Sequence, residues 1–256
     1  MGSLTDTQNS IDTRNIAITR VGIKDFTIPV QLLSKTGIQH SIATVSMYTQ
    51  LEGKYRGTHM SRFITLICEN KQPINAATMR ELTTNMCHRL EAKGGEIILQ
   101  APLFIEKKAP VTQITSLINY EIIYHTRIRD EKIEQFLEVK IPTTSLCPCS
   151  KEISDYGAHN QRSIVNILVQ YNHDIIPEIL IEIAEKSSSC ELYSILKRPD
   201  EKYVTEKAYE NPKFVEDIVR DIYQLLSKQT EIISFKISSE NFESIHNHSA
   251  YAEIVS

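Results

Sequence analysis

The segment Thr112–Arg129 carries the pattern that most restricts how this chain can fold. Tyr120, Ile122 and Tyr124 alternate with Glu121, Ile123 and His125. Successive side chains of a strand point to opposite faces, so the alternation predicts one long strand with an apolar face and a mixed face. We therefore interpret His125 as a residue of the strand face rather than a metal ligand. A strand of this length needs long antiparallel partners, which makes an antiparallel sheet the expected framework.

Further elements of the same kind precede and follow this strand. Alternating, β-branched segments predict strands, whereas Pro73–Lys93 starts with proline, has apolar residues at helical spacing and ends at two glycines. The first two strands are expected to form a hairpin around Gly37. We leave the type of the short apolar run Phe63–Ile67 open. The other predicted strands are Val21–Leu33, Ile38–Tyr48, Glu96–Glu106, Lys132–Lys140, Ser163–Tyr171, Glu231–Ser238 and Ala250–Val255, and the other predicted helices are Pro177–Lys186, Glu191–Leu196 and one opening at Asn211-Pro212.

The order of elements repeats, which predicts an α+β fold made of two modules of the type β-β-α-β-β. Helices are expected on one face of long antiparallel sheets. We place the first module at residues 16–130 and the second, with most of the candidate site residues, at 131–256. Residues 1–15 are polar and unpatterned, and we expect them to form a mobile tail.

Composition excludes several classes of function. The chain has 256 residues, a formal net charge of −4 and 41% hydrophobic residues, which is typical of a globular protein with a substantial core. It lacks the basic runs expected of a nucleic-acid-binding protein. It also lacks an apolar stretch long enough to span a bilayer and an N-terminal apolar signal core. We expect a cytoplasmic protein.

The loop Pro142–Ser163 is the most reactive stretch of the sequence. Cys147 and Cys149 are separated by one proline, and His159 follows within the same loop. One intervening residue is a strained spacing for a disulfide, so a metal ion or a reactive thiolate is the better interpretation. The other three cysteines, Cys68, Cys87 and Cys190, lie in apolar or helical contexts, and we expect them to be buried.

Three later places offer further metal ligands or acid–base groups. Glu201 belongs to Arg198–Lys202, which we interpret as a loop with two adjacent carboxylates. Glu216 lies in the first turn of the last helix, where a carboxylate is also favoured by the helix dipole. The last site is a turn between the final strands that carries Glu243, His246 and His248. Each alone is a weak signal, because loop carboxylates are usually solvated and single histidines are usually structural.

A site with thiolate, imidazole and carboxylate ligands has a definite metal preference. Thiolate and imidazole favour Zn²⁺, while a carboxylate makes Mn²⁺ or Fe²⁺ acceptable. Three protein ligands leave a position open for water, as in catalytic sites.

Cationic side chains are concentrated in Leu51–Arg62. Arg56, His59 and Arg62 lie there with two glycines. The loop either binds an anion such as a phosphate or is a solvated turn, and the sequence favours neither.

The segments SLCPCSKEISDYGAHNQRS, YRGTHMSRF, YENPKFVED and FESIHNHSAYA resemble GTP cyclohydrolase IB, and the likeness extends from about residue 20 to the end of the chain. The resemblance implies a tunnelling fold, a homotetramer with active sites at subunit interfaces, and conversion of GTP to 7,8-dihydroneopterin triphosphate and formate in folate synthesis. It also implies one divalent metal ion per site, which would be Zn²⁺, Mn²⁺ or Fe²⁺.

Particular residues take roles from this resemblance. Cys147, His159 and Glu201 match the expected metal ligands, and Glu216 matches the glutamate that anchors the guanine edge. Glu243, His246 and His248 are candidates for acid–base chemistry, and Arg56, His59 and Arg62 are our choice for the triphosphate. Cys149 has three open roles: second thiolate ligand, proton donor, or oxidation partner of Cys147.

Related proteins leave alternatives open. An archaeal cyclohydrolase of similar sequence gives a cyclic phosphate, and a related nitrile reductase uses a cysteine nucleophile with NADPH. A third alternative is a non-catalytic purine- or pterin-binding module with a structural zinc ion. Formate release from GTP separates the enzyme from the binding module, and NADPH consumption identifies the reductase.

Overall fold

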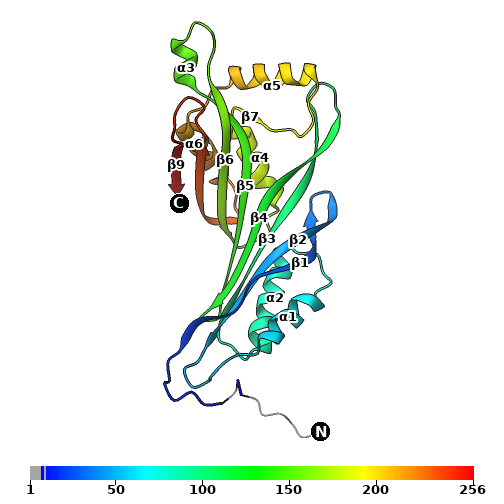
Figure 1. Cartoon of the computed structure of the whole chain (residues 1–256), viewed down its shortest axis with the longest axis vertical. Helices are drawn as coiled ribbons and strands as arrows, with labels where there is room; N and C mark the ends of the chain where they lie inside the picture. The colour runs from blue at the N-terminus through cyan, green and yellow to red at the C-terminus, as the bar shows by residue number, and fades with distance from the viewer. Residues whose placement is uncertain (1–6, 9) are drawn as a thin grey trace. The chain divides into compact units, whose positions relative to one another are not determined.

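Long antiparallel strands dominate the computed structural model, which describes residues 7, 8 and 10–256. Figure 1 shows the chain and labels its elements. The strands are β1 (Ile18–Ser34), β2 (Gly37–Leu51), β3 (Gly95–Lys108), β4 (Thr115–Arg129), β5 (Lys132–Leu146), β6 (Asn160–Tyr171), β7 (Cys190–Glu191), β8 (Ile232–Asn241) and β9 (Ala250–Val255). The helices are α1 (Met60–Glu69), α2 (Ala76–Arg89), α3 (Pro148–Ile153), α4 (Pro177–Ser187), α5 (Arg198–Glu210) and α6 (Val215–Leu226).

Hydrogen bonding within the described residues joins the strands in the order β1-β2-β3-β4-β5-β6-β8-β9, and β7 pairs with β5. The element order is therefore two repeats in which helices separate pairs of antiparallel strands. This confirms the predicted α+β fold class and its duplication. Among the described residues, no helix combines the length and apolar character needed to cross a membrane.

The chain forms two compact units that are not continuous in sequence. Unit 1 contains residues 1–101 and 123–136, and unit 2 contains residues 102–122 and 137–256. Strands β3, β4 and β5 each contribute one part to each unit. The predicted modules 16–130 and 131–256 divide the sequence at the β4–β5 hairpin, and this division stays a prediction.

Burial follows the predicted alternation along β4. Tyr120, Ile122 and Tyr124 are buried, while the intervening residues keep contact with solvent. His125 lies on that second face, where its Nε2 is 2.8 Å from the Glu96 Oε2. The interpretation of His125 as a strand-face residue is confirmed.

In unit 1 the β1–β2 hairpin forms as predicted. Ser34 pairs with Gly37, whose φ of 122° is available to glycine but strained for other residues. The apolar run Phe63–Ile67 belongs to α1, and so does Arg62, so the cationic loop is shorter than predicted. The predicted helix Pro73–Lys93 is α2, which is capped by Asn75 through the Thr78 N–H.

Part of the predicted mobile tail lies outside the described residues. The described part makes backbone hydrogen bonds: the Asp12 N–H donates to the Lys54 carbonyl at 3.0 Å, and the Arg56 N–H donates to the Ser10 carbonyl at 3.0 Å. Ile11 forms an isolated antiparallel bridge with Tyr55. Residues 10–12 therefore run along the loop that follows β2.

Two predictions in unit 2 are wrong. The supposed loop Arg198–Lys202 is the first turn of α5, because Pro199 occupies an early helical position and the Asp200 carboxylate accepts the Lys197 N–H at 3.0 Å. Asp200 is buried and also accepts the Val111 and Thr112 N–H groups. The supposed helix Glu191–Leu196 is wrong as well: β7 pairs with Thr143 and Thr144 of β5, and irregular chain follows.

A charged pair fixes α5 to β7. The Lys207 Nζ donates to the Glu191 Oε2 at 2.6 Å, and the Tyr193 hydroxyl donates to the Glu191 Oε1 at 2.6 Å. Burial alone would raise the pKa of Glu191, but these hydrogen bonds outweigh it and lower the pKa from 4.5 to about 2.

We expect Glu191→Gln to destabilise the fold. The change removes a charge-assisted bond and leaves a half-buried lysine unpaired, which costs about 1–2 kcal/mol because Lys207 retains contact with water. A carboxyl whose pKa falls on folding stabilises the protein above its unfolded pKa. The midpoint temperature of thermal unfolding should therefore be lower for the variant than for wild type at pH 7. This difference should shrink as the pH falls from about 5 toward 2.

The matched control is Glu206→Gln, which removes an exposed pair with Lys202 on the same helix. A surface pair contributes little, so this variant should unfold close to wild type. Equal stability of Glu191→Gln and Glu206→Gln at pH 7 would contradict the anchoring of α5.

Candidate active site

The Cys147–His159 loop is closed by hydrogen bonds at its base. Cys147 follows the last residue of β5 and its N–H donates to the His159 carbonyl at 3.1 Å. The Ser150 hydroxyl donates to the Cys147 carbonyl at 3.1 Å and accepts the His159 N–H at 3.2 Å. The sequence folds this way because Pro148 starts the short helix α3, for which Cys147 is the N-cap. The predicted loop thus contains a helical turn, and its two candidate ligands lie at its two ends.

The His159 ring is held from one side. Its Nδ1 lies 2.9 Å from the Gln161 Oε1, 3.4 Å from the Ser244 Oγ and 3.9 Å from the Glu243 Oε2. The His159 side chain is only 13% exposed. Among the described residues, the hydrogen bonds and ion pair of this ring all use Nδ1, which leaves Nε2 as the nitrogen available to a metal ion.

Strand register brings Glu243 to the loop. Strand β8 runs antiparallel to β6, with Asn241 opposite Ser163, and the Phe242 N–H donates to the Arg162 carbonyl at 2.9 Å. Each residue beyond Asn241 therefore lies beside a residue nearer to His159. The Glu243 side chain is 13% exposed, much less than a solvated turn carboxylate. The structure thus brings the Glu243 carboxylate beside the His159 ring, while Cys147 meets His159 through the backbone.

His246 and His248 lie in the turn after Glu243, as predicted. Their rings stack with centroids 5.1 Å apart and an interplanar angle of 19°, and both residues are exposed. A pair of adjacent imidazoles can exchange protons with solvent and with each other. Among the described residues, neither His246 nor His248 makes a hydrogen bond or ring contact with His159.

Glu201 and Glu216 occupy exposed positions in the first turns of α5 and α6. Within residues 7, 8 and 10–256, neither carboxylate has a hydrogen bond or ion pair, so both are free to bind a ligand. The described residues also contain no cluster of three or more His, Cys, Asp or Glu side chains ready to hold a metal ion. Glu201 is therefore not gathered with Cys147 and His159 in this chain.

Contacts between α3 and α5 connect the cysteine loop to the helix that carries Glu201. The Lys151 Nζ donates to the Tyr209 carbonyl at 2.5 Å and lies 4.3 Å from the centre of the Tyr209 ring. The Lys213 N–H, just after α5, donates to the Leu146 carbonyl at 3.0 Å. The carboxyl end of α5 is thus attached at both sides of Cys147.

The five cysteines are free thiols in different surroundings. Cys87 and Cys190 are buried as predicted, and burial raises the pKa of each thiol to about 11. Cys68 is exposed, so its predicted burial is wrong: it lies on the outer side of α1, whose buried residues are Phe63, Leu66 and Ile67. Cys149 is exposed on α3.

The predicted anion-binding residues belong to unit 1. His59 and Arg62 line a cavity of about 170 Å³ together with Lys54 and Lys93. Glu52 pairs with both lysines, and the Arg62 guanidinium donates to the Arg89 carbonyl at 3.1 Å. Arg56 is exposed and does not line this cavity.

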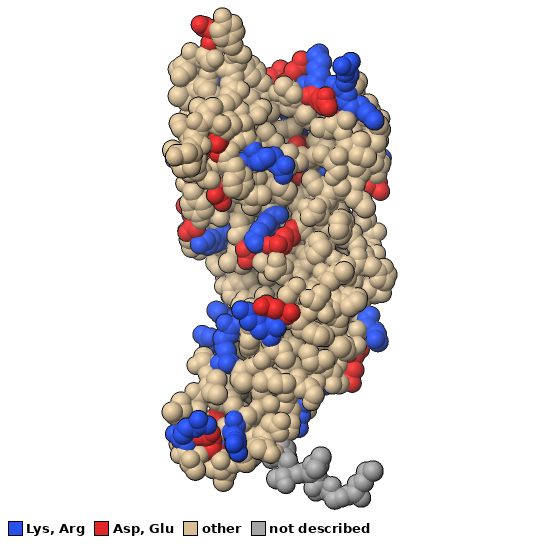
Figure 2. Space-filling view, in the orientation of Figure 1, with Lys and Arg blue, Asp and Glu red and all other residues tan. Residues whose placement is uncertain are grey.

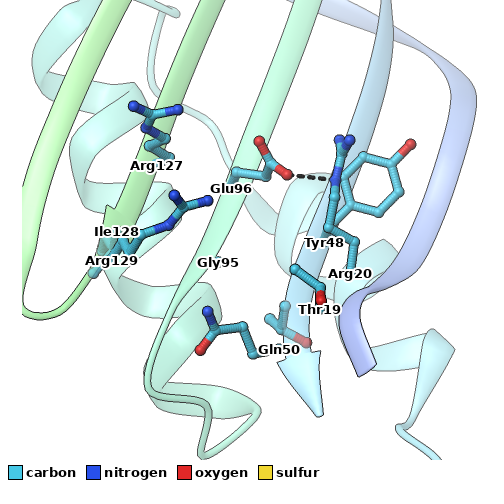
Figure 3. Close-up of a pocket in the computed structure, with 10 residues that line it drawn as sticks. Thr19, Arg20, Tyr48, Gln50, Gly95, Glu96, Arg127, Ile128 and Arg129 are labelled. Atoms are coloured by element: carbon cyan, nitrogen blue, oxygen red, sulfur yellow. Dashed lines mark ion pairs between the residues drawn. The ribbon is translucent and has the colours of Figure 1, made fainter. Parts of the chain in front are cut away.

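A second cavity in unit 1 was not predicted. Arg20, Arg127 and Arg129 converge on it from β1 and β4 (Figure 3). Glu96 pairs with Arg20, and Arg127 pairs with Glu134, so acidic side chains already balance much of the positive charge. Figure 2 shows the same arrangement more widely, with lysine and arginine beside aspartate and glutamate in small mixed groups. We interpret this cavity as a space between the ion-paired side chains on this face of the strands, rather than as a ligand site.

Comparison with known proteins identifies the fold and then the family. The structure is similar to a uricase from Arthrobacter globiformis, with a TM-score of 0.58 and 8% identity over 93% of this chain and 92% of that one. It is also similar to a urate oxidase from Bacillus sp. TB-90, with a TM-score of 0.54 and 8% identity over 93% of this chain and 98% of that one. At this identity the likeness shows the fold alone, and it confirms an α+β tunnelling fold.

Sequence comparison goes further. A family model described as type I GTP cyclohydrolase FolE2 matches residues 4–252. The chain is 48% identical to a GTP cyclohydrolase FolE2 of Herminiimonas arsenicoxydans, over 99% of this chain and 97% of that protein. It is 50% identical to a GTP cyclohydrolase FolE2 of Methylobacillus flagellatus, over 97% of this chain and 94% of that protein.

Fold and site thus define a tunnelling-fold protein with a cysteine–histidine loop at the end of two paired strands. The chain belongs to the type I GTP cyclohydrolase FolE2 family.

We expect Ser150→Ala to loosen the loop without unfolding the protein. The change leaves the His159 N–H and the Cys147 carbonyl without their shared partner. Hydrogen exchange measured by NMR or mass spectrometry should be faster at the His159 amide, because local opening becomes easier. Ser154→Ala is the control, since the Ser154 hydroxyl accepts the exposed Tyr156 N–H and lies at the other end of α3. Unchanged exchange at His159 would show that Ser150 does not hold the loop.

Proposed function

We propose that this chain is a GTP cyclohydrolase of the IB type in tetrahydrofolate biosynthesis. It opens the imidazole ring of guanine by hydrolysis and gives formate and 7,8-dihydroneopterin triphosphate. The observation that carries the proposal is a loop in which Cys147 is bonded to His159 through the backbone and Glu243 lies beside the His159 ring, in a chain that matches a GTP cyclohydrolase family over residues 4–252. A cytoplasmic location belongs to the same proposal, since free thiols persist in a reducing compartment.

The residues at the loop fit a divalent metal ion by the chemistry of their donors. Within the part of the chain that the structure describes, the Cys147 Sγ accepts only the Ser150 N–H, at 3.4 Å, and the His159 Nε2 faces away from the groups that hold Nδ1. Thiolate and imidazole suit Zn²⁺, and Glu201 as a third ligand makes Mn²⁺ or Fe²⁺ acceptable as well. When bound, such an ion acts as a Lewis acid and lowers the pKa of water toward neutrality.

Glu201 joins these ligands in the assembled enzyme. It projects from α5, whose carboxyl end is attached to the cysteine loop by Lys151 and Lys213. We propose a homotetramer with active sites at subunit interfaces, in which packing of neighbouring copies completes each site.

Ring opening needs proton transfers at two positions. One group must take a proton from the attacking water, and another must give a proton to N7 of guanine. We assign these transfers to Glu243, His246 and His248: Glu243 is close to His159, and the stacked histidines lie in contact with solvent. Cys149 stays a candidate for a further proton transfer, because it is exposed one residue beyond Pro148.

Two groups of residues are proposed to bind GTP. Glu216 has a carboxylate without a partner in the described chain, and it can accept two hydrogen bonds from N1–H and the 2-amino group of guanine. Arg56, His59 and Arg62 bind the triphosphate, supplied by a neighbouring copy of the chain. Guanidinium groups form charge-assisted hydrogen bonds with phosphate oxygens, which a net acidic protein must provide locally.

Cys147→Ala tests the metal site and the reaction together. Loss of the thiolate should reduce the bound metal, measured by elemental analysis, and should reduce formate release from GTP to below about 1% of wild type. Cys68→Ala is the matched control, because Cys68 is an exposed cysteine on α1. Normal metal content with normal turnover in Cys147→Ala would refute the proposed ligand, and wild-type protein that releases no formate in the presence of Zn²⁺, Mn²⁺ or Fe²⁺ would refute the activity.

Glu216→Gln separates binding from metal chemistry. A neutral amide loses charge-assisted bonds worth about 1.5–3 kcal/mol, so KM for GTP should rise roughly 10- to 100-fold with metal content intact. Glu182→Gln, on the exposed face of α4, should leave KM unchanged. A KM for Glu216→Gln equal to that of wild type would exclude the anchor role.

A further inference from the structure

The buried face of strands β5, β6 and β8 changes its chemistry toward the cysteine loop. Along most of their length the inward residues are aliphatic or aromatic, as in Val139, Val165 and Ile237. Near the loop the inward positions become polar while remaining buried. These buried polar residues are Thr143 and Ser145 on β5, Gln161 and Ser163 on β6, and Ser239 and Asn241 on β8.

Side-chain hydrogen bonds join five of these residues, since the Ser239 hydroxyl also donates to the Asn241 Oδ1 at 3.5 Å, and the series from Asn241 through Ser163, Ser145 and Gln161 ends at His159. The Gln161 Nε2 donates to the Ser145 Oγ at 2.9 Å, and the Ser145 and Ser163 hydroxyl oxygens are 2.9 Å apart. The Ser163 hydroxyl donates to the Asn241 Oδ1 at 2.7 Å. At the other end, the Gln161 Oε1 lies 2.9 Å from the His159 Nδ1.

The number of protons available decides which group donates in each of these hydrogen bonds. A hydroxyl carries one proton, and the Asn241 Oδ1 can only accept, so the Ser163 proton points to Asn241. The Ser145 proton then points to the Ser163 oxygen, and the Ser145 oxygen accepts from the Gln161 amide. The amide nitrogen of Gln161 is thereby committed to Ser145, and only its oxygen can face His159.

We propose that Gln161 is a positioning residue that holds the proton of neutral His159 on Nδ1 and keeps the Nε2 lone pair open for a divalent metal ion. This inference rests on the proposed metal site. A carbonyl oxygen on Nδ1 fixes both the tautomer and the orientation of a ligating imidazole.

The free-energy cost of burying polar groups supports a dedicated role for this series of hydrogen bonds. Polar groups in a strand core are unfavourable unless they are hydrogen-bonded, and aliphatic residues at the same inward positions form the rest of this core. The hydrogen bonds from Gln161 through Ser145 and Ser163 to Asn241 restore those bonds for four residues, while the Thr143 Oγ1 has no partner among the described residues. A connected series of this kind is rigid, so a rotation of Gln161 would require the Ser145 and Ser163 hydroxyls to reverse. At the end of the series nearest the cysteine loop, the group that these hydrogen bonds hold is the His159 ring.

The tautomer can be measured without metal or substrate. In metal-free protein labelled with ¹⁵N at histidine, long-range ¹⁵N–¹H correlation spectra report which ring nitrogen carries the proton of the neutral ring, and His159→Gln assigns the signal. Wild type should show Nδ1–H, and Gln161→Leu should show a shift toward Nε2–H. A neutral His159 with its proton on Nε2 in wild type would overturn the proposal, since the chain would then run in the opposite direction.

Metal affinity supplies the second readout. Gln161→Leu should weaken Zn²⁺ binding roughly 10- to 100-fold in a chelator competition, whereas Gln161→Glu should bind Zn²⁺ within a few-fold of wild type because a carboxylate also accepts from Nδ1–H. Gln170→Leu is the matched control: it makes the same change at the far end of β6, where Gln170 accepts from Ser234. Equal Zn²⁺ affinity of Gln161→Leu and Gln170→Leu would refute the positioning role.

These results are separable from a failure of the proposed function. If Cys147→Ala keeps its metal, the metal site itself is refuted while the tautomer measurement still stands. If Cys147→Ala loses its metal and Gln161→Leu does not, only the role of Gln161 is refuted.

Discussion

The hydrogen bond between the Cys147 N–H and the His159 carbonyl is the contact on which the proposed site depends. It extends the pairing of β5 and β6 past the end of both strands, so the two candidate ligands are held on the rigid end of a sheet rather than on a free loop. Because a functional site needs its ligands fixed to well under an ångström, attachment to paired strands is a physical advantage. The register of β8 on β6 then determines which residue arrives beside His159, and that residue is Glu243.

Unit 2 uses the same strands for stability and for chemistry. Over most of their length the inward faces of β5, β6 and β8 bury aliphatic side chains, which provides the hydrophobic contribution to folding. At the end that carries the loop, those faces hold hydroxyls and amides that bond to one another. The transition from an apolar core to a polar network explains how a single sheet can be both a rigid support and a source of oriented hydrogen bonds.

Sequence reasoning succeeded where one short-range pattern decides the structure. The alternation in β4, the β1–β2 hairpin at Gly37 and the reactive loop around Cys147 follow from local rules. The start of α5 was missed although Pro199 and Asp200 are helix-start signals, because five charged or breaking residues in a row resemble a solvated loop. Strand β7 and the exposure of Cys68 depend on tertiary pairing and on which helix face meets the sheet, and neither is visible in the local sequence. The role of Gln161 needs the registers of three strands at once, and the family resemblance assigned roles only to residues that match its motifs.

The central claim is that Cys147 and His159 bind the same metal ion, and X-ray absorption at the zinc edge tests it most directly. We expect one sulfur scatterer at about 2.3 Å together with nitrogen and oxygen scatterers at about 2.0–2.2 Å in Zn²⁺-loaded protein. Cys147→Ala should lack the sulfur shell, and His159→Ala should lack the multiple-scattering signature of imidazole. A spectrum of wild-type protein with only nitrogen and oxygen scatterers would show that Cys147 does not bind the metal ion.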